Sequence, residues 1–154
     1  MLFRSGTWSS TGTIAVSAGT LNLSGTFTQP TLFNRTGGTV QIVGTLIGGL
    51  ALNATTGSWN LVGGTISGGT LTQAGGAQLV LTASGGTLSG VTVNGDLDLT
   101  QVNNANLTVY NNTVINGIVS LGKADGSTVG QIYFGDGSAV AQRSEERRVG
   151  KECA

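Results

Sequence analysis

The sequence predicts an all-β protein whose short strands stack turn upon turn as a parallel β-helix, or β-solenoid. A sequence motif first seen at residues 20–27 is repeated four more times along the chain. Its first apolar residues are, in order, Leu21, Val40, Trp59, Leu79 and Leu97, and the steps between them are 19, 19, 20 and 18. A fixed period of about 20 residues is typical of stacked repeats, so we expect about 18–20 residues in each turn.

Composition supports the same fold. Of the 154 residues, 27 are glycine, one is proline, and 38% are hydrophobic. The glycines separate short runs rich in Leu, Val, Ile and Thr, as turn residues separate strands. No stretch places apolar residues at helical spacing over eleven or more positions. Because an isolated turn cannot bury its apolar side, successive turns must stack to form a common core.

Strands can be assigned in order from alternation, because side chains two residues apart on a strand share a face. In residues 1–19, Phe3 and Trp8 either cover the first turn or face a turn before it. Each of the next four segments predicts three short strands, and their apolar side chains would fill a narrow core. The apolar residues of these strands are Leu21/Leu23, Phe27 and Leu32-Phe33 in 20–38; Val40/Ile42, Leu46 and Leu50/Leu52 in 39–57; Trp59/Leu61, Ile66 and Leu71 in 58–77; and Leu79/Leu81, Leu88 and Val91/Val93 in 78–95.

The pattern is looser from Asp96 onward. Apolar runs continue at Leu97/Leu99, 107–110, 114–115, Ile118, Leu121 and 132–134. Asp125-Gly126 and Asp136-Gly137 are turn signals between them. Glycine and asparagine are expected at corners that need a positive φ. Asn34 and Asn53, one period apart, either serve such corners or stack as a hydrogen-bonded ladder.

The end of the chain differs from the rest. Residues 143–153 resemble the in-frame translation of a common sequencing adapter, and the only cysteine, Cys153, falls within them. We therefore divide the chain into a β-solenoid fragment without true caps, 1–142, and a non-native tail, 143–154. The alternative for this tail is a charged docking helix with Ser144 as its N-cap.

Four segments resemble a known group of proteins. Gly19–Gly25 and Gly69–Gln73 are similar to repeats of bacterial autotransporter passenger domains and filamentous-haemagglutinin-type exoproteins. Residues 116–122 and 124–128 resemble repeats of very large bacterial surface proteins of the same style. The resemblance implies a right-handed β-helix in a secreted or cell-surface protein. It is the basis for an extracellular location, since residues 1–6 lack the regions of a signal peptide.

Composition excludes several kinds of chemistry. Histidine is absent and cysteine occurs only in the tail, so the usual zinc, copper and haem ligand sets and a Ser-His-Asp triad are missing. We predict no catalytic, cofactor-binding or metal-binding residue. Asp125-Gly126-Ser127 and Asp136-Gly137-Ser138 could form calcium loops, but they lack the repeated ligand pattern of such loops and favour plain turns.

One pair of carboxylates is the basis for an alternative hypothesis, in which the protein is a β-helix enzyme that acts on polysaccharide. Asp96 and Asp98 flank Leu97 on a predicted strand, so both side chains face solvent, and Lys123 follows about one turn later. Some β-helix enzymes act on acidic polysaccharides with surface carboxylates, calcium and a basic residue. Two solvated acids beside a strand are the simpler interpretation.

The main hypothesis is therefore a structural, non-catalytic rod segment of a large secreted or surface protein, which presents other modules as adhesins do. Only three basic residues precede the tail, Arg4, Arg35 and Lys123, and this argues against nucleic acid as a partner. No apolar stretch reaches membrane-spanning length, so no membrane contact is expected from this segment. The expected partners are a carbohydrate or a host or surface protein, bound by the polar Thr, Ser and Asn faces or by loops such as 102–113. Open turns at the ends would favour self-association.

Overall fold

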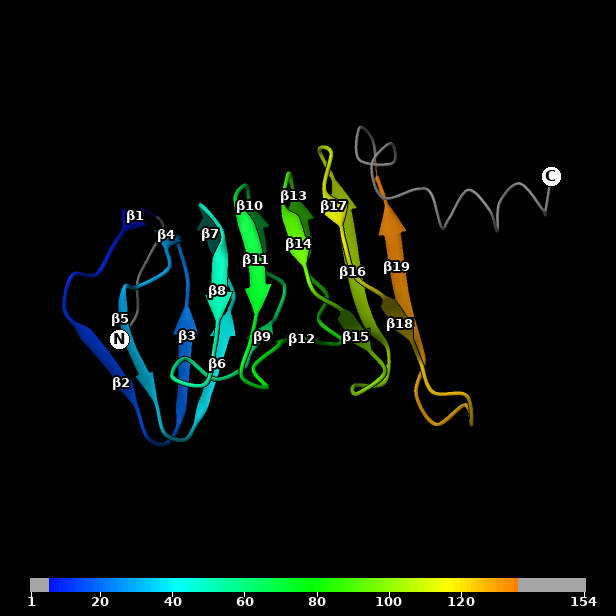
Figure 1. The fold of residues 1–154 in the computed structure, drawn as a ribbon, viewed down its shortest axis with the longest axis horizontal. Coiled ribbons are helices and arrows are strands. Elements are labelled where there is room, and N and C mark those ends of the chain that lie inside the picture. Colours follow the sequence, from blue (N-terminus) through cyan, green and yellow to red (C-terminus); the bar gives the residue numbers. More distant parts are fainter. Residues whose placement is uncertain (1–5, 136–154) are drawn as a thin grey trace.

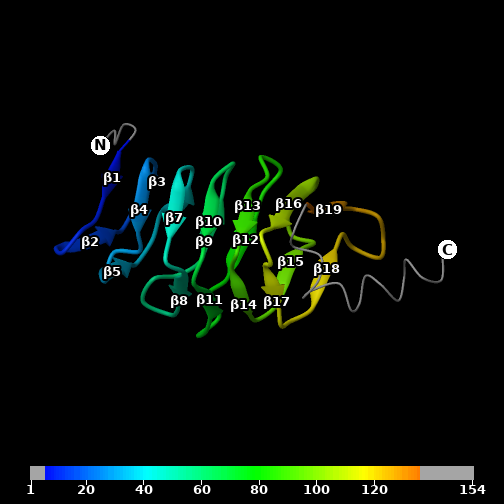
Figure 2. The same cartoon turned by 90° about the horizontal axis from the view of Figure 1, so that it is seen from above.

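The computed structural model describes residues 6–135, which form a β-solenoid of about six turns with no helix. Each turn contributes three short parallel strands, and successive turns lie side by side along the long axis of the molecule (Figures 1 and 2). The predicted all-β fold, parallel stacking and three strands per turn are confirmed. Phe3, Arg4, Asp136-Gly137-Ser138 and the tail 143–154 lie outside the described residues.

The strands form three columns along the solenoid. Column A is one sheet of seven strands: β1 (Thr7–Trp8), β4 (Thr26–Thr28), β7 (Thr45–Ile47), β10 (Thr65–Ser67), β13 (Thr87–Ser89), β16 (Ala105–Tyr110) and β19 (Gly130–Phe134). Column B holds β2 (Thr13–Val16), β5 (Leu32–Arg35), β8 (Leu50–Leu52), β11 (Thr70–Gln73), β14 (Thr92–Asn94) and β17 (Val114–Ile115). Column C holds β3 (Thr20–Leu23), β6 (Thr39–Ile42), β9 (Trp59–Leu61), β12 (Leu79–Leu81), β15 (Leu97–Leu99) and β18 (Val119–Leu121).

Only column A is a continuous sheet among the described residues. In column B the strand ladder is interrupted between β5 and β8. In column C it is interrupted between β12 and β15. Columns B and C are therefore each built of two sheets.

The pairing register shows how the turn length changes along the chain. In column A, Thr7 pairs with Thr26, Thr26 with Thr45, and Thr45 with Thr65, so these first turns have the predicted length. The later partners lie further apart in sequence, because Thr65 pairs with Thr87 and Thr108 with Tyr133. Over the whole solenoid a turn takes about 21 residues. The later turns are therefore longer than predicted.

The corner between columns C and A accounts for the longer turns. It holds only residues 24–25 after β3, but residues 82–86 after β12 and 122–129 after β18. One hydrogen bond closes the last corner, from Lys123 N to Thr128 O at 3.1 Å, and a second, from Thr128 Oγ1 to Thr100 O at 2.7 Å, ties it to the corner one turn earlier. Insertions in stacked repeats commonly collect on one side in this way.

The core is one continuous cluster of apolar side chains inside the stack, to which the strands of all three columns contribute. Leu23, Phe27, Ile42, Leu46, Trp59, Leu61, Ile66, Leu71, Leu79, Leu81, Leu88, Val93, Leu97 and Leu99 are all buried, as predicted from alternation. The predicted strand at Leu32-Phe33 is β5, in which Phe33 is buried and its neighbour Leu32 is 52% exposed, because adjacent side chains on a strand point to opposite faces. Ile118 and Leu121, in the last complete described turn, are 67% and 48% exposed.

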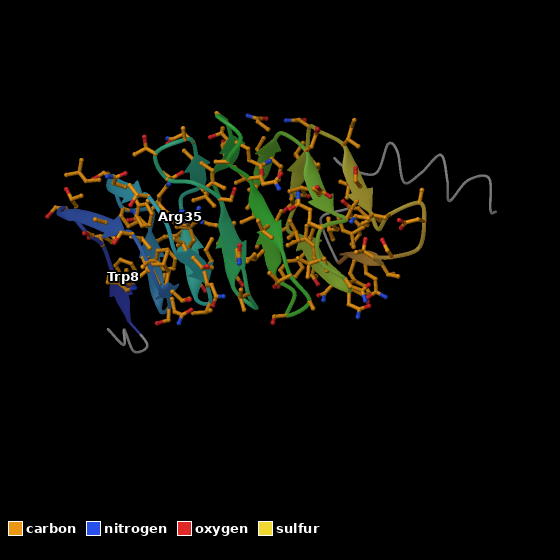
Figure 3. The ribbon with its side chains drawn as sticks, turned by 90° about the horizontal axis from the view of Figure 1, so that it is seen from below. Trp8 and Arg35 are labelled. Atoms are coloured by element: carbon orange, nitrogen blue, oxygen red, sulfur yellow. The ribbon has the colours of Figure 1, made fainter. Side chains whose placement is uncertain are left out.

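Trp8 and Arg35 hold the first turns together (Figure 3). The Trp8 ring stacks on Phe27 with a centroid separation of 4.9 Å, and its Nε1 donates to Ser24 O at 2.7 Å. Trp8 thus covers the first turn, one of the two roles expected for it. The Arg35 guanidinium donates to Gly38 O at 2.7 and 3.1 Å and to Ser58 O at 3.2 Å, so its charge ties two corners together.

Several glycines stand where one turn touches the next. Gly44 N donates to Leu23 O at 2.9 Å, and a Cβ on Gly44 would overlap the backbone of Gly25 one turn earlier. The close approach of the two backbones, rather than a positive φ, requires glycine at this position. No helix in residues 6–135 is long and apolar enough to span a membrane.

Gly44→Ala should lower the free energy of unfolding by about 1–3 kcal/mol, because the added methyl group has no space between two backbones. Gly12→Ala is the matched control, since a Cβ there meets nothing within 4 Å, and its effect should stay within about 1 kcal/mol. Urea unfolding of both variants measures the difference. Equal stabilities would contradict the close packing of turns at Gly44.

Candidate functional site

Both members of the predicted carboxylate pair form hydrogen bonds that organise the local chain. Asp98 Oδ1 accepts from Thr100 N at 2.8 Å and from Thr100 Oγ1 at 2.6 Å, and Oδ2 accepts from Gln101 Nε2 at 2.8 Å. Asp96 Oδ1 accepts from Ile118 N of the following turn at 2.9 Å. One carboxylate therefore closes a corner, and the other links two turns.

The electrostatics of Asp98 follow from these contacts. The Thr100 hydroxyl makes the largest contribution and lowers the pKa of Asp98 below its usual value, although partial burial acts in the opposite direction. Gln101 lowers this pKa further, and the positive charge of Lys123 has the smallest effect. Lys123 therefore acts on Asp98 through space, as its predicted position one turn later implies.

The Asp125-Gly126-Ser127 segment forms a turn. Asp125 Oδ1 accepts from Ser127 N at 2.8 Å, and the hydrogen bonds from Ser127 lower the pKa of this exposed carboxyl. Gly126 has a φ of 77°, as the turn signal predicted. Within residues 6–135, no three acidic, histidine or cysteine side chains gather to hold a metal ion.

Asparagines serve both of the roles considered for them. Asn104, Asn111 and Asn112 adopt positive φ angles of 62°, 57° and 61° at corners. Asn53 Oδ1 accepts from Thr55 N at 2.8 Å, so it closes its own corner. A stacked pair forms instead at Asn94 and Asn116, where Asn116 Nδ2 donates to Asn94 Oδ1 at 2.9 Å across one turn.

A glutamine side chain bridges the interruption in column C. Gln73 Oε1 accepts from Leu79 N at 2.7 Å, and Gln73 Nε2 donates to Asp96 O at 2.8 Å. The corner before β12 holds residues 74–78, whereas the corner before β15 holds only 95–96. Because the later corner is shorter, β15 does not pair directly with β12, and the side-chain amide replaces the missing peptide contact.

A glutamine side chain also bridges the interruption in column B. Gln29 Nε2 donates to Ala51 O at 2.7 Å, and Ala51 N donates to Gln29 Oε1 at 2.8 Å. Gln29 precedes Pro30, which has no N–H to offer a neighbouring strand. One primary amide thus satisfies both backbone groups of Ala51, as a paired strand would. Neither glutamine can be identified from the sequence alone, because nothing local marks a side chain that pairs with the next turn.

An open hollow of about 350 Å³ lies beside the column C bridge. Its lining consists of Gln73, Ala74, Gly76, Ala77, Gln78, Gly95 and Asp96. The lining therefore comes from β11 and from the corners before β12 and β15. It offers one carboxylate and two amides, of which the Gln73 amide and one oxygen of Asp96 already hold the backbone. The hollow can hydrogen-bond a polar group, but it does not pair two carboxylates.

The outward side of column A forms an uncharged surface, here called the hydroxyl face. Its first row is a ladder of threonines, one in each turn: Thr7, Thr26, Thr45, Thr65, Thr87 and Thr108. Its second row is Thr28, Ile47, Ser67, Ser89 and Tyr110. At β16 and β19 the sheet widens, and Asn106, Gln131 and Tyr133 join the face. These positions include no Asp, Glu, Lys or Arg.

In comparisons with known proteins, no protein-family model, curated protein or solved structure matches the chain.

Gln73→Ala should destabilise the fold by about 1–3 kcal/mol, because Leu79 N and Asp96 O lose their partner. Gln78→Ala is the matched control, since Gln78 lines the same hollow without bridging these two backbone groups. Urea denaturation of both variants tests the bridge. A Gln73→Ala protein as stable as the Gln78→Ala protein would show that the amide is dispensable.

Thr100→Val should raise the pKa of Asp98 toward its ordinary value of 3.8, because the hydroxyl that lowers it most is removed. A lowered folded-state pKa adds stability above the unfolded-state value, and this stability is lost as the pH falls through the folded-state pKa. The variant should therefore lose less stability on acidification. NMR titration of the Asp98 carboxyl carbon measures the pKa, with Thr72→Val as the control. An unchanged pKa would contradict the assigned cause.

Proposed function

We propose that this chain is a structural, non-catalytic rod segment of a large secreted or cell-surface bacterial protein, and that it holds other modules away from the surface. The single observation that carries the proposal is the unbroken column A, in which seven strands pair in register from β1 to β19. A continuous ladder over a continuous core makes an elongated body with no hinge in that sheet.

The polar and charged groups support a structural role. Asp96, Asp98 and Arg35 all form hydrogen bonds that connect or close corners, as described above. Charged residues make up only 9% of the sequence, and the solvent-facing rows are mainly Thr, Ser and Asn. The resemblance to autotransporter passenger and filamentous-haemagglutinin-type repeats supports export and surface display.

A rod built of equivalent turns should tolerate additional turns. Insertion of three further copies of residues 26–44, one complete turn each, should lengthen the molecule by roughly 14 Å, because each strand adds about 4.8 Å along the stack. Small-angle X-ray scattering measures the longest dimension, and circular dichroism confirms retained β-structure. As a control, insertion of one and a half turns breaks the register and should lower stability. If the variant with inserted turns has the same longest dimension as the original protein, the rod proposal is wrong.

A further inference from the structure

The widened end of the hydroxyl face carries a patch that the rod function does not need. We define the tyrosine patch as Asn106, Thr108 and Tyr110 of β16 with Gln131 and Tyr133 of β19. Asn106 pairs with Gln131 and Thr108 with Tyr133 on adjacent parallel strands. Their neighbours Leu107 and Val109 are buried, so alternation places the patch on the outer surface.

Both tyrosines contact neighbouring residues, in the patch or directly after β19. Tyr133 is 52% exposed, and its hydroxyl donates to Gln131 Oε1 at 2.6 Å. The Tyr110 ring lies over Gly135, where an added Cβ would come within 3.1 Å of Cδ1. Each contact narrows the range of positions of its side chain, which lowers the conformational entropy that binding has to remove. Tyr110 and Tyr133 are diagonal neighbours, close enough for one extended chain to touch both.

The chemistry of the patch favours a neutral partner rich in hydroxyl groups. Two aromatic rings offer apolar faces for the C–H side of a sugar ring, and hydroxyl and amide groups offer hydrogen bonds. The patch contains no cation to attract phosphate or an acidic polymer and no carboxylate to attract a base. The two rows of the hydroxyl face continue from the patch along the rod. Each row has one side chain per turn, about 4.8 Å apart, because this is the spacing of paired strands.

We propose that the tyrosine patch binds a neutral polysaccharide, with Tyr110 and Tyr133 stacked on its sugar rings. The inference rests on the proposed surface rod, to which it adds the class of partner. The ligand lies across β16 and β19, and the adjacent rows of Thr87 and Ser89 extend the contact surface. The polymer is held by stacking and neutral hydrogen bonds, so its binding changes little with salt.

Depletion assays on cellulose, chitin and xylan, with polygalacturonate as the acidic comparison, test this proposal. The full chain should bind at least one neutral polymer, and Tyr110→Ala/Tyr133→Ala should weaken that binding by about tenfold or more. Tyr133→Phe keeps the ring and should retain most of the binding. Ile118→Ala is the matched control, because Ile118 is an exposed apolar residue in the same region but away from the patch.

Three results would overturn the proposal: no binding to any of the neutral polymers, equal binding by the double variant, or binding confined to polygalacturonate that disappears with added salt. Circular dichroism and scattering on each variant report separately whether the rod is intact. An elongated wild-type protein that binds no neutral polymer refutes the patch alone, whereas a protein that is not elongated refutes the rod. If the double variant misfolds, Tyr133→Ala provides the comparison.

Discussion

In-register pairing of each strand with the strand one turn later is the interaction on which this structure depends. It satisfies the backbone hydrogen bonds of each turn and stacks equivalent side chains, which gives the threonine ladder outside and the apolar row inside. A single turn could do neither, since its apolar side would face solvent. The strand spacing also brings backbones into contact at corners such as Gly44 and Gly117, where any Cβ would overlap the previous turn.

The pairing is interrupted in two columns, and the interruptions show how strict the constraint is. At both, a glutamine side chain provides the amide that a strand would have provided, at Ala51 for Gln29 and at Leu79 and Asp96 for Gln73. A primary amide carries the same donor and acceptor as a peptide group, so it can take the place of one in the ladder, and at Leu79 N it pairs a partly buried donor. Changes in corner length can therefore accumulate without loss of the stack.

The sequence predicted the period of the early turns, the three strands per turn and most buried positions, because these follow from spacing and alternation along the chain. The sequence did not decide which of Leu32 and Phe33 faces inward, since both are apolar; in the structure Phe33 is buried and Leu32 is exposed. The longer late turns and the Asn94–Asn116 stack were missed for a different reason. Both depend on which residues lie opposite each other one turn apart, and variable corners shift that register. The structural roles of Asp96 and Asp98 likewise needed the positions of Ile118 and Thr100.

Interstrand nuclear Overhauser contacts along column A test the central claim most directly. The structure predicts backbone contacts between Thr26 and Thr45, Thr45 and Thr65, and Thr65 and Thr87, in the pattern of parallel strands. Each threonine should contact only the threonines one turn before and after it. Antiparallel contacts between strands consecutive in sequence, such as β3 with β4, would contradict the solenoid and the rod function derived from it.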